Sequence, residues 1–297
     1  MRRIIFQLIM YLGFSINLYS QSPVAPEKPV SHYESLAALN GNKNRDRSWM
    51  DTISFPWTEY SKGALTISLI RTIYLSPEDE AELPQLINYP ANSSDQTRAE
   101  LDYLIKLQES RTSEQIAKAE YIAKIGSSPL IINPTDPDYH VNLEQLFYIA
   151  EPVGKWYNPG NFPATTQLLL NCIQDIRVTE FRLKKHFKRA RPYHLEPKLN
   201  PLARISSPSF ASGHTLWAFT QAFLFSEIIP GMRTEFIHRA EEVRWSRELM
   251  GIHYPSDNEA SRIISWHLIR SWYNNPRFVA DLEKAKAEWA ARKKSFK

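Results

Sequence analysis

The chain has 297 residues, of which 43% are hydrophobic and 23% are charged, as in an ordinary soluble globular protein with a substantial core. The formal charge of +4 favours anionic partners in general but is too small to identify nucleic acid as one of them. The single cysteine, Cys172, excludes an intrachain disulfide, and its apolar neighbours predict a buried side chain. Only 9 glycines accompany 20 prolines, which favours helices punctuated by proline.

Residues 1–20 resemble an export signal. Arg2 and Arg3 precede a mostly apolar stretch, and Ser20 supplies a small residue before an expected cleavage at Gln21. Polar residues interrupt this stretch, and no other segment reaches the roughly 20 apolar residues of a membrane-spanning helix. We therefore expect a periplasmic or secreted protein without stable membrane insertion.

The next segment carries weak structural signals. Residues 21–50 are rich in proline, serine, asparagine and charge, which predicts a poorly ordered linker. Between residues 65 and 73 apolar residues alternate with serine and threonine, which indicates a short strand. Because one strand cannot stand alone, a helix remains the alternative. We expect a linker and an irregular or strand-containing extension over residues 21–75, followed by a helical domain over residues 76–297.

From Ser76 onward the pattern predicts an all-α helical bundle. Capping residues or prolines mark helix starts near residues 76, 94, 112, 163, 212, 232, 255 and 276. The longest helix is expected over residues 163–191, ending just before Pro192, because the residue before a proline disfavours helical backbone angles.

Basic residues gather at the end of this long helix. Lys184 and Arg191 are seven residues apart, nearly two turns, so both are expected to project from one helix face with Lys188 between them. The run KKHFKRAR has two other interpretations: a solvated charged face, or a patch that binds nucleic acid. The residues that accompany it later in the chain favour a binding site.

Ser212, Gly213 and His214 open an apolar helix. Small residues at a helix start leave backbone N–H groups accessible, and the helix dipole favours an anion there. His214, in the first turn, would face the same anion. Taken alone, a Ser-Gly pair before a helix is commonly only a cap.

A third cluster contains Arg247, His253 and Asp257. Asp257 follows His253 by four residues, in the first turn of the helix that Pro255 opens. A carboxylate at this distance can bind one imidazole nitrogen and leave the other nitrogen free to act as a nucleophile. The alternative is a helix-capping aspartate beside an ordinary surface histidine.

The three clusters together resemble the signature of the type 2 phosphatidic acid phosphatase and vanadium haloperoxidase superfamily, and most closely the class A bacterial non-specific acid phosphatases. The matching elements are Lys184-x6-Arg191-Pro192, Ser212-Gly213-His214 and Ser246-Arg247-x5-His253-x3-Asp257. The resemblance covers roughly residues 83–292. In one departure, Ala211 stands where the family usually has a proline, and we expect an altered turn without loss of mechanism.

The resemblance implies an all-α fold and hydrolysis of phosphomonoesters without a metal or cofactor. His253 would attack phosphorus to form a phosphohistidine, with Asp257 orienting it. His214 would protonate the leaving group and then activate water. The phosphate oxygens would be bound by Lys184, Arg191, Ser212, Gly213 and Arg247.

Three functions follow from these residues. We favour a phosphomonoesterase with a small-molecule substrate and no nucleic-acid partner. A vanadium-dependent haloperoxidase would use the same pocket, and a non-enzymatic protein could bind a polyanion through KKHFKRAR. The last interpretation leaves the spacing of His253 and Asp257 unexplained. The physiological substrate, phosphotransfer to an alcohol acceptor and a homo-oligomer remain open.

Overall fold

The computed structural model describes residues 31–125 and 135–294, and over these ranges the chain is all-α, as the sequence predicts. One isolated bridge, between Ser54 and Arg189, is the single β-type pairing in this part of the chain. The expected export signal and residues 21–30 lie outside the described residues. No helix described here is long and apolar enough to cross a membrane.

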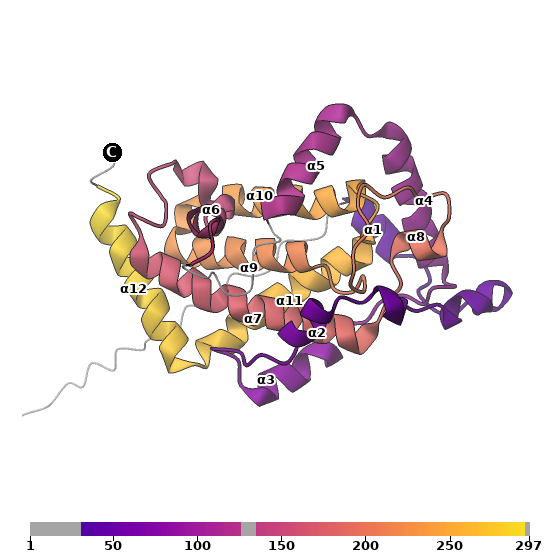
Figure 1. Cartoon of the computed structure of the whole chain (residues 1–297), viewed down its shortest axis with the longest axis horizontal. Coiled ribbons are helices and arrows are strands. Elements are labelled where there is room, and N and C mark those ends of the chain that lie inside the picture. The colour runs from indigo at the N-terminus through magenta and orange to yellow at the C-terminus, as the bar shows by residue number, and fades with distance from the viewer. Residues whose placement is uncertain (1–30, 126–134, 295–297) are drawn as a thin grey trace, which may run out of the picture.

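Helix α9 (Gly213–Ile228) is the centre of the bundle (Figure 1). Every residue of α9 except His214 is buried. A helix that is apolar on all sides must be surrounded by other elements. Helices α7 (Pro163–Phe187), α10 (Arg233–Leu249) and α11 (Pro255–Tyr273) pack directly against it.

Further elements cover this core. They are α3 (Pro77–Glu82), η3 (Leu83–Gln85), α4 (Asp95–Ser110), α5 (Ser113–Ile125), α6 (Tyr139–Gln145), η4 (Tyr148–Val153), α8 (Pro192–Leu195), η5 (Pro230–Met232) and α12 (Pro276–Arg292). Helix α12 lies across the start of α7 at one end of the bundle, and α4 and α5 project at the other end (Figure 1).

Local capping explains why most predicted helix starts are confirmed. Ser76 accepts a hydrogen bond from the N–H of Asp79 at 3.1 Å, and Asp79 accepts one from the N–H of Ser76 at 3.0 Å. Thr112 and Gln115 form the same reciprocal arrangement before α5. Prolines occupy the first position of α7, α11 and α12, where their missing N–H has no cost.

The expected helix over residues 163–191 is too long. Helix α7 ends at Phe187, and Lys188 adopts a left-handed backbone with φ of 51°. The Lys188 carbonyl accepts a hydrogen bond from the N–H of Phe55 at 2.9 Å, so the N-terminal extension pairs with the chain where the helix stops. The prediction that Lys184 and Arg191 share one helix face, with Lys188 between them, is therefore wrong.

Two predictions for the N-terminal extension are also wrong. Residues 31–50 form α1 (Ser31–Ala37), which packs on α4 and α11, and part of η1 (Arg45–Thr52), instead of a loose linker. Residues 62–67 form α2 (Lys62–Ile67) instead of a strand, next to the short turn η2 (Trp57–Glu59). Ala64 and Ser68 are buried while Leu69 is 74% exposed, which is a helical spacing of buried positions and not an alternating one.

Asp175 fastens the segment before α3 to the bundle. It lies buried on α7, and its carboxylate accepts hydrogen bonds from the N–H groups of Ile73, Tyr74 and Leu75 and from the indole of Trp272 at 2.5–3.2 Å. Burial raises the pKa of Asp175 to about 6, partly offset by these donors. One side chain thus connects the extension, α7 and α11.

We expect Asp175→Ala to lower the free energy of unfolding by about 3 kcal/mol or more, because several buried N–H donors lose their acceptor. Urea unfolding followed by tryptophan fluorescence measures this loss. Asp102→Ala, at an exposed residue of α4, is the control and should change stability by less than about 0.5 kcal/mol. A loss for Asp175→Ala as small as the control would contradict the anchoring role.

Candidate active site

His253 and Asp257 form a buried pair where α10 leads into α11. His253 Nδ1 lies 3.1 Å from Asp257 Oδ2, and because an ionised carboxylate only accepts hydrogen bonds, Nδ1 carries the proton. Nε2 lies 2.9 Å from Nη1 of Arg191, and a guanidinium only donates. The ring is therefore held in the tautomer whose Nε2 is unprotonated, and the lone pair of Nε2 accepts a hydrogen bond from Arg191.

Asp257 is kept ionised by its neighbours. Arg189 Nη1 lies 2.7 Å from Oδ1, and Oδ2 accepts hydrogen bonds from the Ser209 hydroxyl and the Tyr254 N–H. Burial by itself would raise the pKa of Asp257, but the charge of Arg189 and the contact with His253 hold it well below its usual value. The carboxylate is thus available to orient His253 across the physiological pH range.

The predicted cations Lys184, Arg191 and Arg247 are each only 1% exposed. Backbone carbonyls hold them: Lys184 Nζ donates to Pro208 O at 2.7 Å, and Arg247 Nη2 donates to Ala119 O at 3.1 Å. Within the described ranges neither Arg191 nor Arg247 forms an ion pair. Carbonyl dipoles leave the full positive charge in place, so these groups are suited to bind an anion.

Arg191 reaches the cluster from the N-cap position of α8. Its Nε donates to Ser207 O at 2.9 Å, and its Nη1 donates to Ile252 O at 2.8 Å. Burial and the nearby charge of Arg191 lower the pKa of Lys184 to about 7. Lys184 therefore carries its charge below about pH 7 and loses it above, so the free site attracts anions best on the acidic side.

Ser212, Gly213 and His214 lie at the start of α9. The Ser212 N–H donates to Asp257 O at 3.4 Å, which places the start of α9 beside α11. His214 Nε2 lies 3.0 Å from Ala123 O on α5, so Nε2 carries the proton and Nδ1 is left free. His214 is only partly buried, whereas the other predicted site residues are buried. It is thus the predicted site residue most open to solvent.

The predicted site residues form one cluster. The charges of Arg191 and Lys184 lower the pKa of His253 after the larger effect of burial. The charges of Arg247 and His253 act in the same way on His214, again after burial. We call the start of α9 at Gly213, together with Lys184, Arg191 and Arg247, the anion cradle. Two imidazoles from different segments adjoin it.

The sequence prediction missed Arg189 and Glu100. Arg189 is 1% exposed, and its guanidinium lies 3.8 Å from the ring centre of Tyr254 and 4.9 Å from that of Tyr89. It also lies 3.5 Å from Glu100 on α4, whose oxygens accept hydrogen bonds from the N–H and hydroxyl of Ser256. Nothing in the run KKHFKRAR distinguishes Arg189 from its exposed neighbours.

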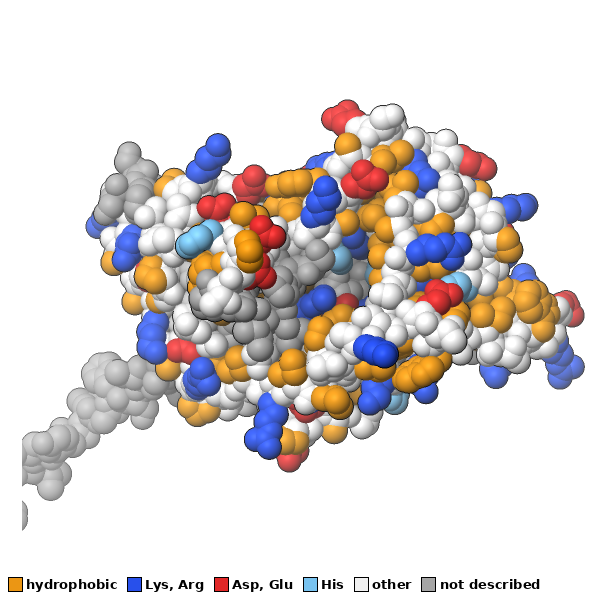
Figure 2. Space-filling model, in the orientation of Figure 1, with side chains coloured by type: hydrophobic (Ala, Val, Ile, Leu, Met, Phe, Trp, Pro, Cys, Tyr) orange, Lys and Arg blue, Asp and Glu red, His pale blue; other side chains and the backbone are white. Residues whose placement is uncertain are grey.

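The same burial contradicts the interpretation of the whole basic run as a solvated charged face. Lys184, Arg189 and Arg191 point into the protein, while Lys185 and Lys188 are exposed. Figure 2 shows basic side chains scattered among acidic and hydrophobic ones on one face of the molecule. The run is therefore not a solvated charged face over its whole length.

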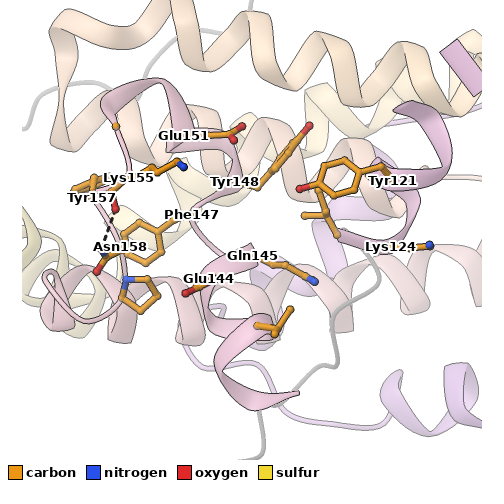
Figure 3. A pocket seen from close by; sticks show the side chains of 14 residues that line it. Tyr121, Lys124, Glu144, Gln145, Phe147, Tyr148, Glu151, Lys155, Tyr157 and Asn158 are labelled. Atoms are coloured by element: carbon orange, nitrogen blue, oxygen red, sulfur yellow. Dashed lines mark hydrogen bonds between the residues drawn. The ribbon is translucent and has the colours of Figure 1, made fainter. Parts of the chain in front are cut away.

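A cavity of about 570 Å³ is lined by residues of α5, α6 and η4 and of the segment after η4 (Figure 3). Its walls include Tyr121, Lys124 and Tyr148. Helix α5 thus contributes both to this cavity and, through Ala123, to the contact with His214. Tyr148 stacks on Trp217, one turn after His214 on α9, at 6.2 Å between ring centres. None of the predicted site residues lines this cavity.

No group of three or more His, Cys, Asp or Glu side chains that could hold a metal ion is present in residues 31–125 and 135–294. Cys172 is buried, as its apolar neighbours predict.

Comparison with known proteins connects this geometry to one family. Residues 164–279 match the model of the PAP2 superfamily. The chain is 32% identical over 156 residues to a non-specific acid phosphatase of Providencia stuartii, covering 49% of this chain and 61% of that protein. It is 29% identical over 159 residues to a non-specific acid phosphatase of Salmonella typhimurium, covering 51% of this chain and 63% of that protein. The chain thus matches less than two thirds of the length of these relatives.

Among solved structures, a bacterial vanadium-dependent iodoperoxidase aligns with a TM-score of 0.52 and 18% identity, covering 82% of this chain and 63% of that one. At this identity the similarity concerns the fold, which agrees with the all-α architecture described above.

In the phosphate-free protein we expect both His253 and His214 to stay neutral well below the pH at which an ordinary imidazole titrates, because burial and the adjacent cations lower their pKa values. Long-range ¹H–¹⁵N NMR of the imidazole rings measures this. Saturating inorganic phosphate adds negative charge beside the rings and should raise both pKa values. A ring that titrates at the ordinary value of 6.5 without phosphate would contradict the buried geometry.

Proposed function

We propose that this chain, whose residues 164–279 match the model of the PAP2 superfamily, is an acid phosphatase that hydrolyses phosphomonoesters through a phosphohistidine intermediate. The supporting observation is the buried His253, whose Nδ1 contacts Asp257 and whose unprotonated Nε2 faces Arg191. Similarity to two non-specific acid phosphatases supports the same reaction class.

In the first step a phosphate oxygen takes over the hydrogen bond that Arg191 donates to His253 Nε2, and the released Nε2 lone pair attacks phosphorus. A P–N bond forms as the bond from phosphorus to the ester oxygen breaks. The imidazole becomes positively charged, and Asp257 stabilises that charge through Nδ1–H. His214, protonated on both ring nitrogens once the bound phosphate has raised its pKa, donates the Nδ1 proton to the departing alkoxide. Such general acid catalysis is typically worth about 10²–10⁴ in rate.

In the second step His214, now neutral, accepts a proton from water through the same Nδ1. The resulting hydroxide attacks phosphorus, the P–N bond breaks, and inorganic phosphate leaves with His253 restored. Both steps place negative charge on the non-bridging oxygens, where Lys184, Arg191 and Arg247 can bind them. Because these cations are buried and already oriented, they stabilise the transition state without reorganisation. The proposal requires no metal ion.

The charge of the cradle is compatible with one alternative function. Vanadate has the charge and shape of a phosphate in its transition state, so the cradle would also suit a vanadium-dependent haloperoxidase. Halide oxidation with vanadate and peroxide, without ester hydrolysis, would identify that enzyme. For the phosphatase, vanadate should inhibit the hydrolysis of esters instead.

We further propose that the protein is exported through residues 1–20. The N-terminus of the protein isolated from its host tests this proposal. An N-terminus at Gln21 would support export with removal of residues 1–20, and a protein that retains Met1 would contradict it.

His253→Ala should lower kcat on p-nitrophenyl phosphate by about 10⁴-fold or more, because the variant lacks the nucleophile. Release of nitrophenolate in the presence of a chelator measures the activity and also tests metal independence. The matched control is His238→Ala, an exposed histidine of α10, which should keep full activity. A His253→Ala enzyme with nearly unchanged turnover would overturn the assigned role.

His214→Ala should act differently on different esters. With an alkyl phosphate, whose alkoxide leaves only when protonated, we expect kcat for the first step to fall by about 10²–10⁴. With p-nitrophenyl phosphate the first step should change much less, because nitrophenolate is a good leaving group. Burst kinetics separate the two steps. Equal losses of the first step on both esters would contradict a general-acid role.

A further inference from the structure

Glu180 places a carboxylate inside the anion cradle. It lies on α7, one turn before Lys184, and is 5% exposed. Both of its carboxylate oxygens lie so close to Gly213 that a side chain at position 213 would collide with them. Gly213 is the first residue of α9, where free N–H groups and the helix dipole attract negative charge. An internal anion thus lies against the helix start that the mechanism assigns to phosphate.

Cations of the anion cradle and two further residues, Arg177 and Tyr60, surround Glu180. Arg177 forms an ion pair with it from one turn earlier on α7, and Lys184 Nζ lies 3.9 Å from its Oε1. Its negative charge also acts on Arg191 and on the hydroxyl of Tyr60, which follows η2. Glu180 therefore shares two of the cations that the mechanism uses to bind phosphate.

We propose that the carboxylate of Glu180 is an internal competitor that weakens the binding of phosphate to this site, so that product leaves readily. This inference rests on the proposed function, because it assumes that phosphate binds at Gly213 and Lys184. No step of the mechanism uses Glu180. A phosphate dianion bound there would lie within a few ångströms of a like charge in a poorly solvated site, which opposes binding.

A simpler account is that Glu180 only pairs with Arg177 and supports α7. The two accounts differ in what happens when the charge is removed. If Glu180 is only structural, losing its charge changes stability and leaves phosphate affinity as it was. If it competes with phosphate, losing its charge tightens phosphate binding.

The test is Glu180→Gln, which keeps the shape of the side chain and removes its charge. Calorimetry with inorganic phosphate at a fixed pH should give a Kd lower by about tenfold or more, the effect of removing one nearby like charge from a partly screened site. Phosphate should also become a correspondingly stronger product inhibitor. An unchanged or weaker affinity for phosphate would overturn the proposal.

Glu227→Gln is a matched control. Glu227 is also a buried glutamate, 7% exposed, with a lysine nitrogen 3.9 Å away, but it lies near the far end of α9 and accepts a hydrogen bond from Tyr273. Its replacement should leave the Kd for phosphate within about twofold of wild type, because it is a full helix length from the cradle. An equal tightening in both variants would show a general charge effect and overturn the proposal.

Glu180→Asp covers the case in which the glutamine variant does not fold. It keeps the charge but draws it back by one methylene, so we expect a smaller tightening of phosphate binding, and no tightening would contradict the proposal. Binding is measured without turnover, which separates the two hypotheses. A wild-type protein that binds phosphate but hydrolyses no ester refutes the proposed function alone. An active enzyme whose Glu180→Gln variant binds phosphate unchanged refutes this inference alone.

Discussion

Asp257 is fully buried, and its charge is balanced by Arg189, which is just as deeply buried. A buried carboxylate and a buried guanidinium are each costly to remove from water, and breaking such a pair by deleting one partner typically costs about 3–5 kcal/mol. The pair therefore fixes the position of the chain after α7 relative to the start of α11. His253 takes its orientation from Asp257, so the proposed nucleophile depends on an arginine that it does not touch.

The N-terminal extension contributes to the same arrangement. Residues 54 and 55 pair with the chain at residues 188 and 189, directly before the turn that brings Arg191 to His253. On the other side of Arg189, burial raises the pKa of Glu100 to about 7, partly offset by Arg189 and Ser256. Residues 54 and 55, in the segment expected to be an irregular or strand-containing extension, thus help to position the site.

Most cations of the cradle are held by backbone carbonyls, which fix their position without cancelling their charge. Lys184 differs from the other cations because its Nζ also lies 3.9 Å from the carboxylate of Glu180. Glu180 brings a formal negative charge to the start of α9. A cradle with uncancelled charge would bind both substrate and product phosphate tightly. One internal carboxylate lowers the affinity for both, and catalysis depends on the difference between ground state and transition state rather than on tight binding itself.

The sequence by itself determined the helix starts, the all-α class and the three clusters that contain the cradle residues and the two imidazoles. Caps and prolines act within one helical turn, and the spacing from His253 to Asp257 is set inside a single helix start. Only the tertiary structure decided where α7 ends, that residues 62–67 are helical, and which cations of KKHFKRAR are buried. Those outcomes depend on segments distant in sequence, such as the pairing of Phe55 with Lys188 and the ring of Tyr254 over Arg189. A local pattern carries no information about the partner that will cover it, and burial is set by that partner.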